Sequence, residues 1–259
     1  MDNNQSRNPV APIIPLSTSL AFLVSRKQLL GWSALLVVVT IALTWIGFQL
    51  TTGLIDSFTG SFFDIEPVHQ SWWGWLKYGG WLVAKFLFVL VSRIIAFFLA
   101  FLLAYTLTTP FYGFLSASAE KIYWGKEFEQ DDGFSLSGIL IDLWEGFKVA
   151  LFGILVTVAA LAIGFVPIVG QLAVFLLYTF YSALMFVDYP ASRRRWGLGR
   201  KLLWLRRNSA HTARLGLIPA AISMIPVLNM FLLALIFPLF TVHAALNFSA
   251  VELVHRHSR

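Results

Sequence analysis

The stretch QLLGWSALLVVVTIALTWIGFQLTTGLI, residues 28–55, decides the fold of this chain because it contains no charged residue. As an α-helix it is about 42 Å long, whereas the hydrocarbon core of a bilayer is about 30 Å thick. A soluble helix of this length would carry a charged face toward water. The stretch therefore predicts a transmembrane helix that is tilted or protrudes from the membrane.

The overall composition also indicates a membrane protein. Of the 259 residues, 58% are hydrophobic and 12% are charged, and the mean hydropathy is +0.75. A soluble domain carries about 25% charged residues, so this chain lacks the charge to cover a water-facing surface. The net charge of +6 does not predict nucleic-acid binding, because the basic residues flank hydrophobic segments and no reading motif accompanies them. The predicted partner is the lipid bilayer.

A second long apolar segment runs from about Trp81 to Thr108. We expect it to end at Pro110, where the ring clashes with a carbonyl of the preceding turn. Residues 56–76, between the two long segments, contain acidic residues but no lysine or arginine. This loop is predicted to lie on the outer side of the membrane.

Two later segments, 149–187 and 215–251, carry no formal charge but are each interrupted by a proline, two apolar residues and a glycine or asparagine. Glycine and asparagine tolerate turns, so each segment predicts a helix, a tight turn and a returning helix. Residues 215–225 would reach only about 17 Å, and the returning arm meets Pro238 after a similar distance. The second hairpin is therefore expected to enter the membrane without crossing it, and the first could do either.

The predicted fold is an all-α integral membrane protein with two long transmembrane helices and two proline-broken, partly penetrating hairpins. The hairpin breaks, marked by Pro167, Gly170, Pro226 and Asn229, free backbone groups that lipid cannot satisfy. Such breaks indicate either a binding site of a transporter or a tight turn buried in protein.

Basic residues predict the orientation of the chain. They cluster at 193–214, just before the first long helix at Arg26 and Lys27, and at the carboxyl end at Arg256 and Arg259. Both termini and the 193–214 loop are therefore expected in the cytoplasm. The predicted domains are a disordered cytoplasmic tail, a single membrane domain and a second cytoplasmic tail, at 1–15, 16–253 and 254–259.

No catalytic, metal or cofactor site is predicted. The chain has no cysteine, and its five histidines do not show metal-ligand spacing with carboxylates. Asp142 and Glu145 lie three residues apart, but no nucleophile accompanies them, so they are interpreted as a solvated helix face. We expect no enzymatic activity.

Three cations are candidate anion ligands. Arg26 and Lys27 precede a long helix, whose first N–H groups and dipole favour an anion. The alternative is a charge pair that sets topology or contacts a lipid phosphate. Arg93 lies within a hydrophobic run, where a charge costs at least about 3 kcal/mol. It belongs either to an anion path or to a structural pair between helices.

Four motifs resemble, in order, the CysZ-type sulfate permeases, which share a domain with an etoposide-induced protein family of the endoplasmic reticulum. They are TPF at 109–111 with Gly113 and Leu115, FVPIVGQ at 165–171, DYP at 188–190 and MIPVLN at 224–229. The resemblance covers about residues 16–253. It implies two long membrane helices with two partly penetrating hairpins, assembled into homo-oligomers. It also implies sulfate uptake for cysteine synthesis in bacterial inner membranes.

The chain departs from this pattern at the first long helix. The permeases carry a Gly-apolar-Arg-Arg stretch there, next to Leu-Val-Ser, whereas this chain reads LVSRKQLLGW at 23–32. The positive charges are displaced and no glycine precedes them. The resemblance thus implies an inner-membrane anion transporter or channel, with sulfate as the family's substrate. The alternative is a non-transporting scaffold or assembly protein of the same domain family.

Overall fold

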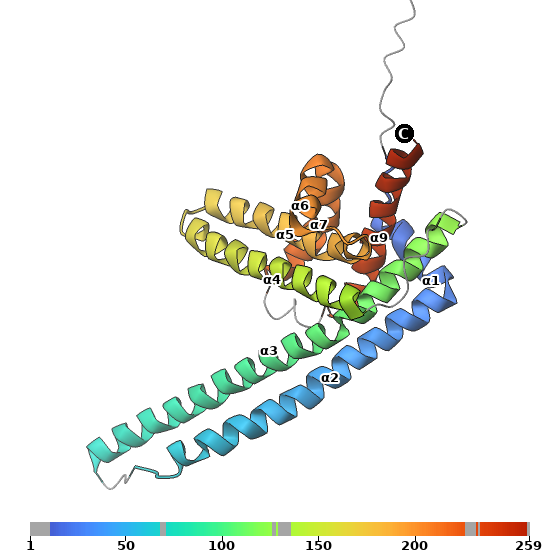
Figure 1. Cartoon of the computed structure of the whole chain (residues 1–259). Helices are drawn as coiled ribbons and strands as arrows, with labels where there is room; N and C mark the ends of the chain where they lie inside the picture. The colour runs from blue at the N-terminus through green and yellow to red at the C-terminus, as the bar shows by residue number, and fades with distance from the viewer. Residues whose placement is uncertain are drawn as a thin grey trace, which may run out of the picture. The chain divides into compact units, whose positions relative to one another are not determined.

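The computed structural model describes residues 11–67, 71–125, 128, 136–225, 232 and 234–257, and the regular structure in these ranges is helical (Figure 1). Five of the described helical stretches are long and apolar enough to cross a membrane. The prediction of an all-helical membrane protein is confirmed. In chain order the elements are α1 (Leu16–Ser25), α2 (Lys27–Thr59), η1 (Gly60–Phe63), α3 (Trp72–Trp124), α4 (Leu136–Gly164), α5 (Val169–Arg193), α6 (Leu198–Arg207), α7 (Ser209–Ser223) and α9 (Ala234–His257).

The chain forms two compact units, and the single membrane domain predicted for residues 16–253 stays a prediction. Unit 1 comprises Met1–Leu36 and Pro110–Arg259, and unit 2 comprises Val37–Thr109. In unit 2, α2 and α3 pack through small residues, since a Cβ added at Gly47 would lie 3.1 Å from the Cβ of Ala100. Ala96, Ala100 and Ala104 repeat every fourth residue and are buried. Small side chains let transmembrane helices approach closely while the large apolar ones face outward.

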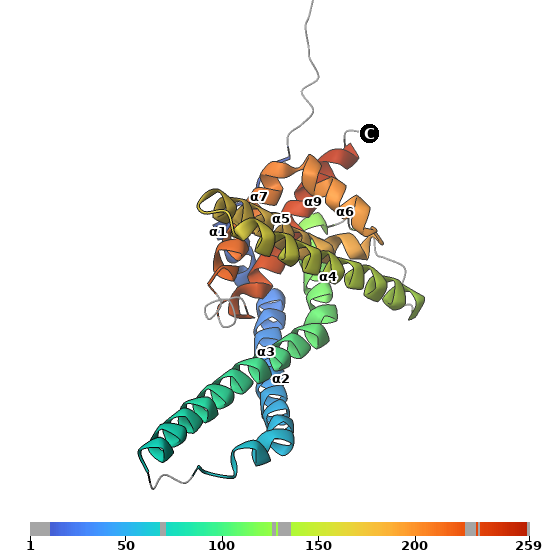
Figure 2. The same cartoon turned by 90° about the vertical axis from the view of Figure 1, so that its left-hand side faces the viewer.

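Helix α9 forms the core of unit 1. It contacts α1, α5 and α7 (Figure 2), and every residue from 240 to 251 is buried. The Phe237 ring lies 4.7 Å from the rings of both Tyr112 and Phe186. A helix that is buried all round is a core helix rather than one that faces solvent or lipid. Helix α5 contacts α4, α6, α7 and α9 and so joins this core helix to the rest of the unit.

Prolines do not end helices where the sequence predicted they would. Helix α3 continues through Pro110, and α9 continues through Pro238. A proline removes one N–H and crowds one carbonyl, which distorts a helix without ending it when packing holds both sides. At 24 residues, α9 is about 36 Å long, so the short returning arm predicted for the second hairpin is wrong. Helix α7 has 15 residues, or about 22 Å, and how deeply either hairpin penetrates stays a prediction.

The first hairpin is confirmed: α4 and α5 lie side by side and are joined by a tight turn (Figures 1 and 2). Ile168 has φ 63° and ψ −64°, and the Val169 N–H donates to the Pro167 carbonyl at 2.7 Å. These angles define a strained γ-turn, which is unusual for a β-branched residue. Gly170 is required beside it, because an added Cβ would overlap the Ile163 carbonyl oxygen.

The packed chain begins before Leu16, within the segment predicted as a disordered tail. The Ile14 N–H donates to the Asn247 side-chain oxygen at 3.0 Å, and the Asn247 amide donates back to the Ile14 carbonyl at 3.2 Å. The Ser19 hydroxyl lies 2.8 Å from Nδ1 of the buried His243. These contacts fix the chain that precedes α2 onto the core helix α9.

Candidate anion-binding site

The start of α2 presents two exposed cations. Arg26 ends α1, and Lys27 is the first residue of α2. Both side chains are exposed, and the Arg26 guanidinium lies 5.9 Å from the Phe22 ring. The first N–H groups of an α-helix have no partner within the helix and favour an anion. This end of α2 therefore combines side-chain charge with the helix dipole.

A hollow of about 490 Å³ lies beside the first turns of α2. Its described lining contains one cation, Lys121, together with polar and apolar side chains and no carboxylate. The lining residues are Gln28, Trp32, Phe114, Ala117, Ser118, Lys121 and Phe128. All of them belong to unit 1. Because Gln28 follows Lys27 directly, this hollow adjoins the cationic helix start.

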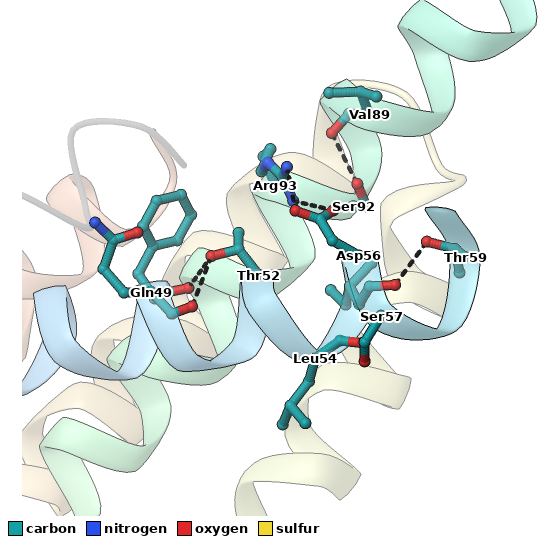
Figure 3. Close-up of polar contacts among 11 residues, drawn as sticks. Gln49, Thr52, Leu54, Asp56, Ser57, Thr59, Val89, Ser92 and Arg93 are labelled. Carbon is teal, nitrogen blue, oxygen red and sulfur yellow. Dashed lines mark hydrogen bonds and ion pairs between the residues drawn. The ribbon is translucent and has the colours of Figure 1, made fainter. Parts of the chain in front are cut away.

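Arg93 is not a free cation. Its two terminal nitrogens donate to the two carboxylate oxygens of Asp56 at 3.0 and 2.9 Å, and the two side chains point toward one another in Figure 3. The nearby Thr52 and Ser92 hydroxyls donate to carbonyls of their own helices instead. Asp56, which the sequence placed in an outer loop, lies within α2 because that helix continues to Thr59. This geometry favours the structural alternative for Arg93, a pair between helices.

We expect Arg93→Gln and Asp56→Asn each to lower the melting temperature of the purified protein, because each leaves a charge on an apolar helix without its partner. The double variant should recover most of the loss, since both charges are then absent. The measurement is a thermal unfolding series on the four proteins in one detergent. If the double variant loses as much melting temperature as the two single variants together, the pairing is contradicted. If the double variant is stable but takes up less anion than the wild type, Arg93 belongs to the anion path.

A second group of charges is buried in unit 1. Glu120 of α3 is fully buried. Its Oε2 accepts a hydrogen bond from a terminal nitrogen of Arg193 at 2.9 Å and forms an ion pair with a terminal nitrogen of Arg194, also at 2.9 Å. The sequence placed these arginines in a cytoplasmic loop. Helix α5 instead continues to Arg193 and carries both arginines against α3. No sequence signal for Glu120 existed beyond its apolar neighbours at helical spacing.

The DYP motif lies at another buried ion pair. Oδ1 of Asp188 lies 2.6 Å from Nζ of Lys201, and that ammonium also donates to the Ser192 hydroxyl at 3.0 Å. Lys201 is fully buried. This contact attaches α6 to α5. Glu145 of α4 holds the other side of α6, since it accepts the Leu198 N–H at 2.9 Å and therefore is not the solvated carboxylate predicted from the sequence.

Of the two predicted hairpin breaks, Pro167 and Gly170 lie in the turn between α4 and α5. The Gln171 side chain donates to the Gly164 carbonyl at 3.3 Å and so satisfies one freed backbone group. This favours the interpretation of this break as a tight turn. Pro226 and Asn229 lie outside the described residues.

The fold and the charges define the class of this chain: a helical, multi-pass membrane protein with a cationic, carboxylate-free hollow among the described residues of unit 1. The family model described as Sulfate transporter CysZ/Etoposide-induced protein 2.4 matches residues 16–234. The chain belongs to this family.

The curated relatives include proteins named Sulfate transporter CysZ. The one from Pseudomonas paraeruginosa is 28% identical over 205 residues, which cover 76% of this chain and 80% of the relative. A protein of the same name from Pseudomonas aeruginosa strain LESB58 gives the same identity and coverage. The one from Pseudomonas fluorescens is 25% identical over 174 residues, which cover 65% of this chain and 68% of the relative.

Proposed function

We propose that this chain is a sulfate uptake transporter that supplies cysteine synthesis. The observation that carries the proposal is the cationic start of α2, with Arg26 and Lys27, beside a hollow whose described lining has no carboxylate. A dianion loses hydration when it leaves water, and this loss costs free energy. Positive charge and hydrogen-bond donors in the protein have to offset that cost for the anion to cross. The relatives named sulfate transporters support sulfate as that anion.

Arg26 and Lys27 would receive the anion, and Lys121 would extend the positive potential into the hollow. Arginine and lysine form charge-assisted hydrogen bonds with oxyanions, which are stronger than neutral ones. The first N–H groups of α2 add neutral donors at the same place. Gln28 supplies a further donor to the lining. Trp32 and Phe114 form the apolar side of the hollow.

The test is uptake of radiolabelled sulfate into vesicles that contain the purified protein. We expect Arg26→Gln with Lys27→Gln to lower uptake roughly tenfold or more, because a hydrogen bond to a charged group contributes about 1.5–3 kcal/mol and 1.4 kcal/mol is a factor of ten. Arg206→Gln is the matched control, since Arg206 is an exposed cation on α6. Equal uptake by all three proteins would contradict the assignment of this site, and no uptake by the wild type would contradict sulfate transport.

The proposal includes an inner-membrane location with both termini and α6 in the cytoplasm, supported by the basic residues at these places. The chain has no cysteine, so single cysteines can be labelled without background. We expect a cysteine at Ser61 to react with an impermeant reagent added outside intact cells, and one at the exposed Ser209 to stay unlabelled. The reverse pattern would overturn this orientation.

We also propose that copies of the chain assemble into a homo-oligomer. The exposed apolar faces of α2 and α3 support this assembly, because they can pack against other copies as well as lipid. Chemical crosslinking in native membranes should give bands above the monomer. A monomer band alone at full crosslinker reaction would contradict the assembly.

A further inference from the structure

Polar side chains repeat every fourth residue along the carboxyl-terminal part of α3, at Tyr112, Ser116, Glu120 and Trp124. Residues at this spacing lie on one face of a helix. Tyr112, Ser116 and Glu120 are almost completely buried, and the indole nitrogen of Trp124 is buried as well. We call this face the α3 polar stripe. A stripe of this kind in an apolar helix has to be matched by polar groups or by a ligand.

The middle of the α3 polar stripe faces two arginines of α5. Both arginines form ion pairs with the same oxygen of Glu120, Oε2, at 2.9 Å, and Arg193 donates a hydrogen bond to it. Arg194 also donates to the Pro190 carbonyl at 2.9 Å and lies over the Phe248 ring at 4.8 Å. The side chains of Arg193 and Arg194 are only 16% and 19% exposed. One carboxylate oxygen is thus shared by two nearly buried guanidinium groups.

Several buried polar atoms of the α3 polar stripe have no hydrogen-bond partner among the described residues. They include the other oxygen of Glu120, the Ser116 hydroxyl and the Trp124 indole nitrogen. Ser116 and Trp124 lie one helical turn on either side of Glu120. Buried polar atoms in folded proteins are nearly always hydrogen-bonded, to protein, ordered water or a ligand. The stripe therefore offers an O–H donor one turn before Glu120 and an N–H donor one turn after it, and the Trp124 ring lies 5.7 Å from the Arg194 guanidinium.

This cluster lies beside the hollow at the start of α2. Phe128 lines that hollow, and the same ring lies 4.6 Å from the Arg193 guanidinium. Lys121, the cation of the hollow, directly follows Glu120 in α3. An anion that enters the hollow is therefore within one side-chain layer of the arginine pair. All these residues belong to unit 1.

We propose that Arg193 and Arg194, with the Ser116 hydroxyl and the Trp124 indole N–H, form an inner binding site for the transported oxyanion. The inference rests on the proposed function and adds a second site to it. Glu120 is the resident counter-ion of the arginines when the site is empty, and the tetrahedral dianion replaces it at the guanidinium groups. All four groups are hydrogen-bond donors, and two of them carry the positive charge that an oxyanion requires.

The substitution Glu120→Gln separates this role from a purely structural ion pair. It removes the competing negative charge, so we expect sulfate to bind at least about tenfold more tightly and to be released and taken up more slowly. Glu252→Gln is the matched control: it removes one negative charge from the same unit and keeps an acceptor for the Trp204 indole N–H, which lies 3.1 Å away. Binding of radiolabelled sulfate is measured on the full chain purified in detergent.

A second variant decides the question if Glu120→Gln does not fold. Ser116→Ala removes one buried hydroxyl and no charge, so the protein should keep its melting temperature and bind sulfate about fivefold more weakly. The inner site is overturned if Ser116→Ala binds sulfate as tightly as the wild type. It is also overturned if Glu120→Gln folds but binds sulfate no more tightly than Glu252→Gln does. If the wild type still takes up sulfate in that case, the proposed function stands. If the wild type neither binds nor takes up sulfate, both fall.

Discussion

Gly216→Ala is expected to destabilise the protein by about 3 kcal/mol, because overpacking at a rigid contact costs about this much. Gly216 of α7 is buried, and an added Cβ would overlap the Thr179 carbonyl oxygen of α5. Both atoms belong to helix backbones, so the clash is relieved only if α5 and α7 move apart. Thermal unfolding in detergent, followed by size-exclusion chromatography, measures the loss.

Gly199→Ala is the matched control for this contact. Gly199 lies in α6, is exposed and has no heavy atom within 4 Å of an added Cβ. Alanine favours a helix over glycine by at most about 1 kcal/mol, so this variant should be as stable as the wild type or slightly more so. If Gly216→Ala has the same melting temperature as Gly199→Ala, the close approach of α5 and α7 is refuted.

Lys201→Met is expected to cost about 3 kcal/mol, because it leaves Asp188 without the ammonium that pairs with it in a nearly buried site. The double variant, Lys201→Met with Asp188→Asn, should regain at least half of the stability that Lys201→Met loses. In the double variant both charges are absent, while the amide can keep a hydrogen bond to the Ser192 hydroxyl. A double variant no more stable than the single one would contradict the ion pair. The measurement is unfolding of the four proteins of this cycle.

A more exposed ion pair provides the comparison. Lys148 pairs with Glu145 three residues earlier on α4, and the two side chains are 39% and 13% exposed. Ion pairs with one solvent-accessible partner at this helical spacing contribute less than buried ones, about 0.5 kcal/mol. Lys148→Met should therefore shift the melting temperature far less than Lys201→Met. Similar shifts would mean that burial does not set the strength of the Lys201 pair.

The membrane class and the first hairpin were predictable because both depend on local sequence. A charge-free stretch such as 28–55 is a property of consecutive residues, and the turn at Pro167 and Gly170 has its chemistry within a few positions. The prediction that Pro110 and Pro238 end helices was wrong for the converse reason. Whether a helix continues past a proline depends on the packing on either side of it, which no window of neighbouring residues contains.

The candidate site was predictable only in part. Arg26 and Lys27 were found because the start of a helix is visible in sequence, together with its effect on an anion. Arg93 was identified as a charge in need of a partner, but Asp56 is 37 residues away along the chain. Glu120 and Arg193 are 73 residues apart. Pairs at such separations are set by how helices pack.

The sequence by itself determined that this chain belongs in a bilayer, that it is helical, and where its cations gather, because hydropathy and helix length act locally. Only the tertiary structure decided which of those cations are neutralised. The bidentate contact pairs Arg93 with Asp56, and the packing of α5 on α3 places Arg193 and Arg194 on Glu120. The physical reason is that a charge in a low-dielectric interior is defined by the groups within a few ångströms of it, whatever their distance along the chain.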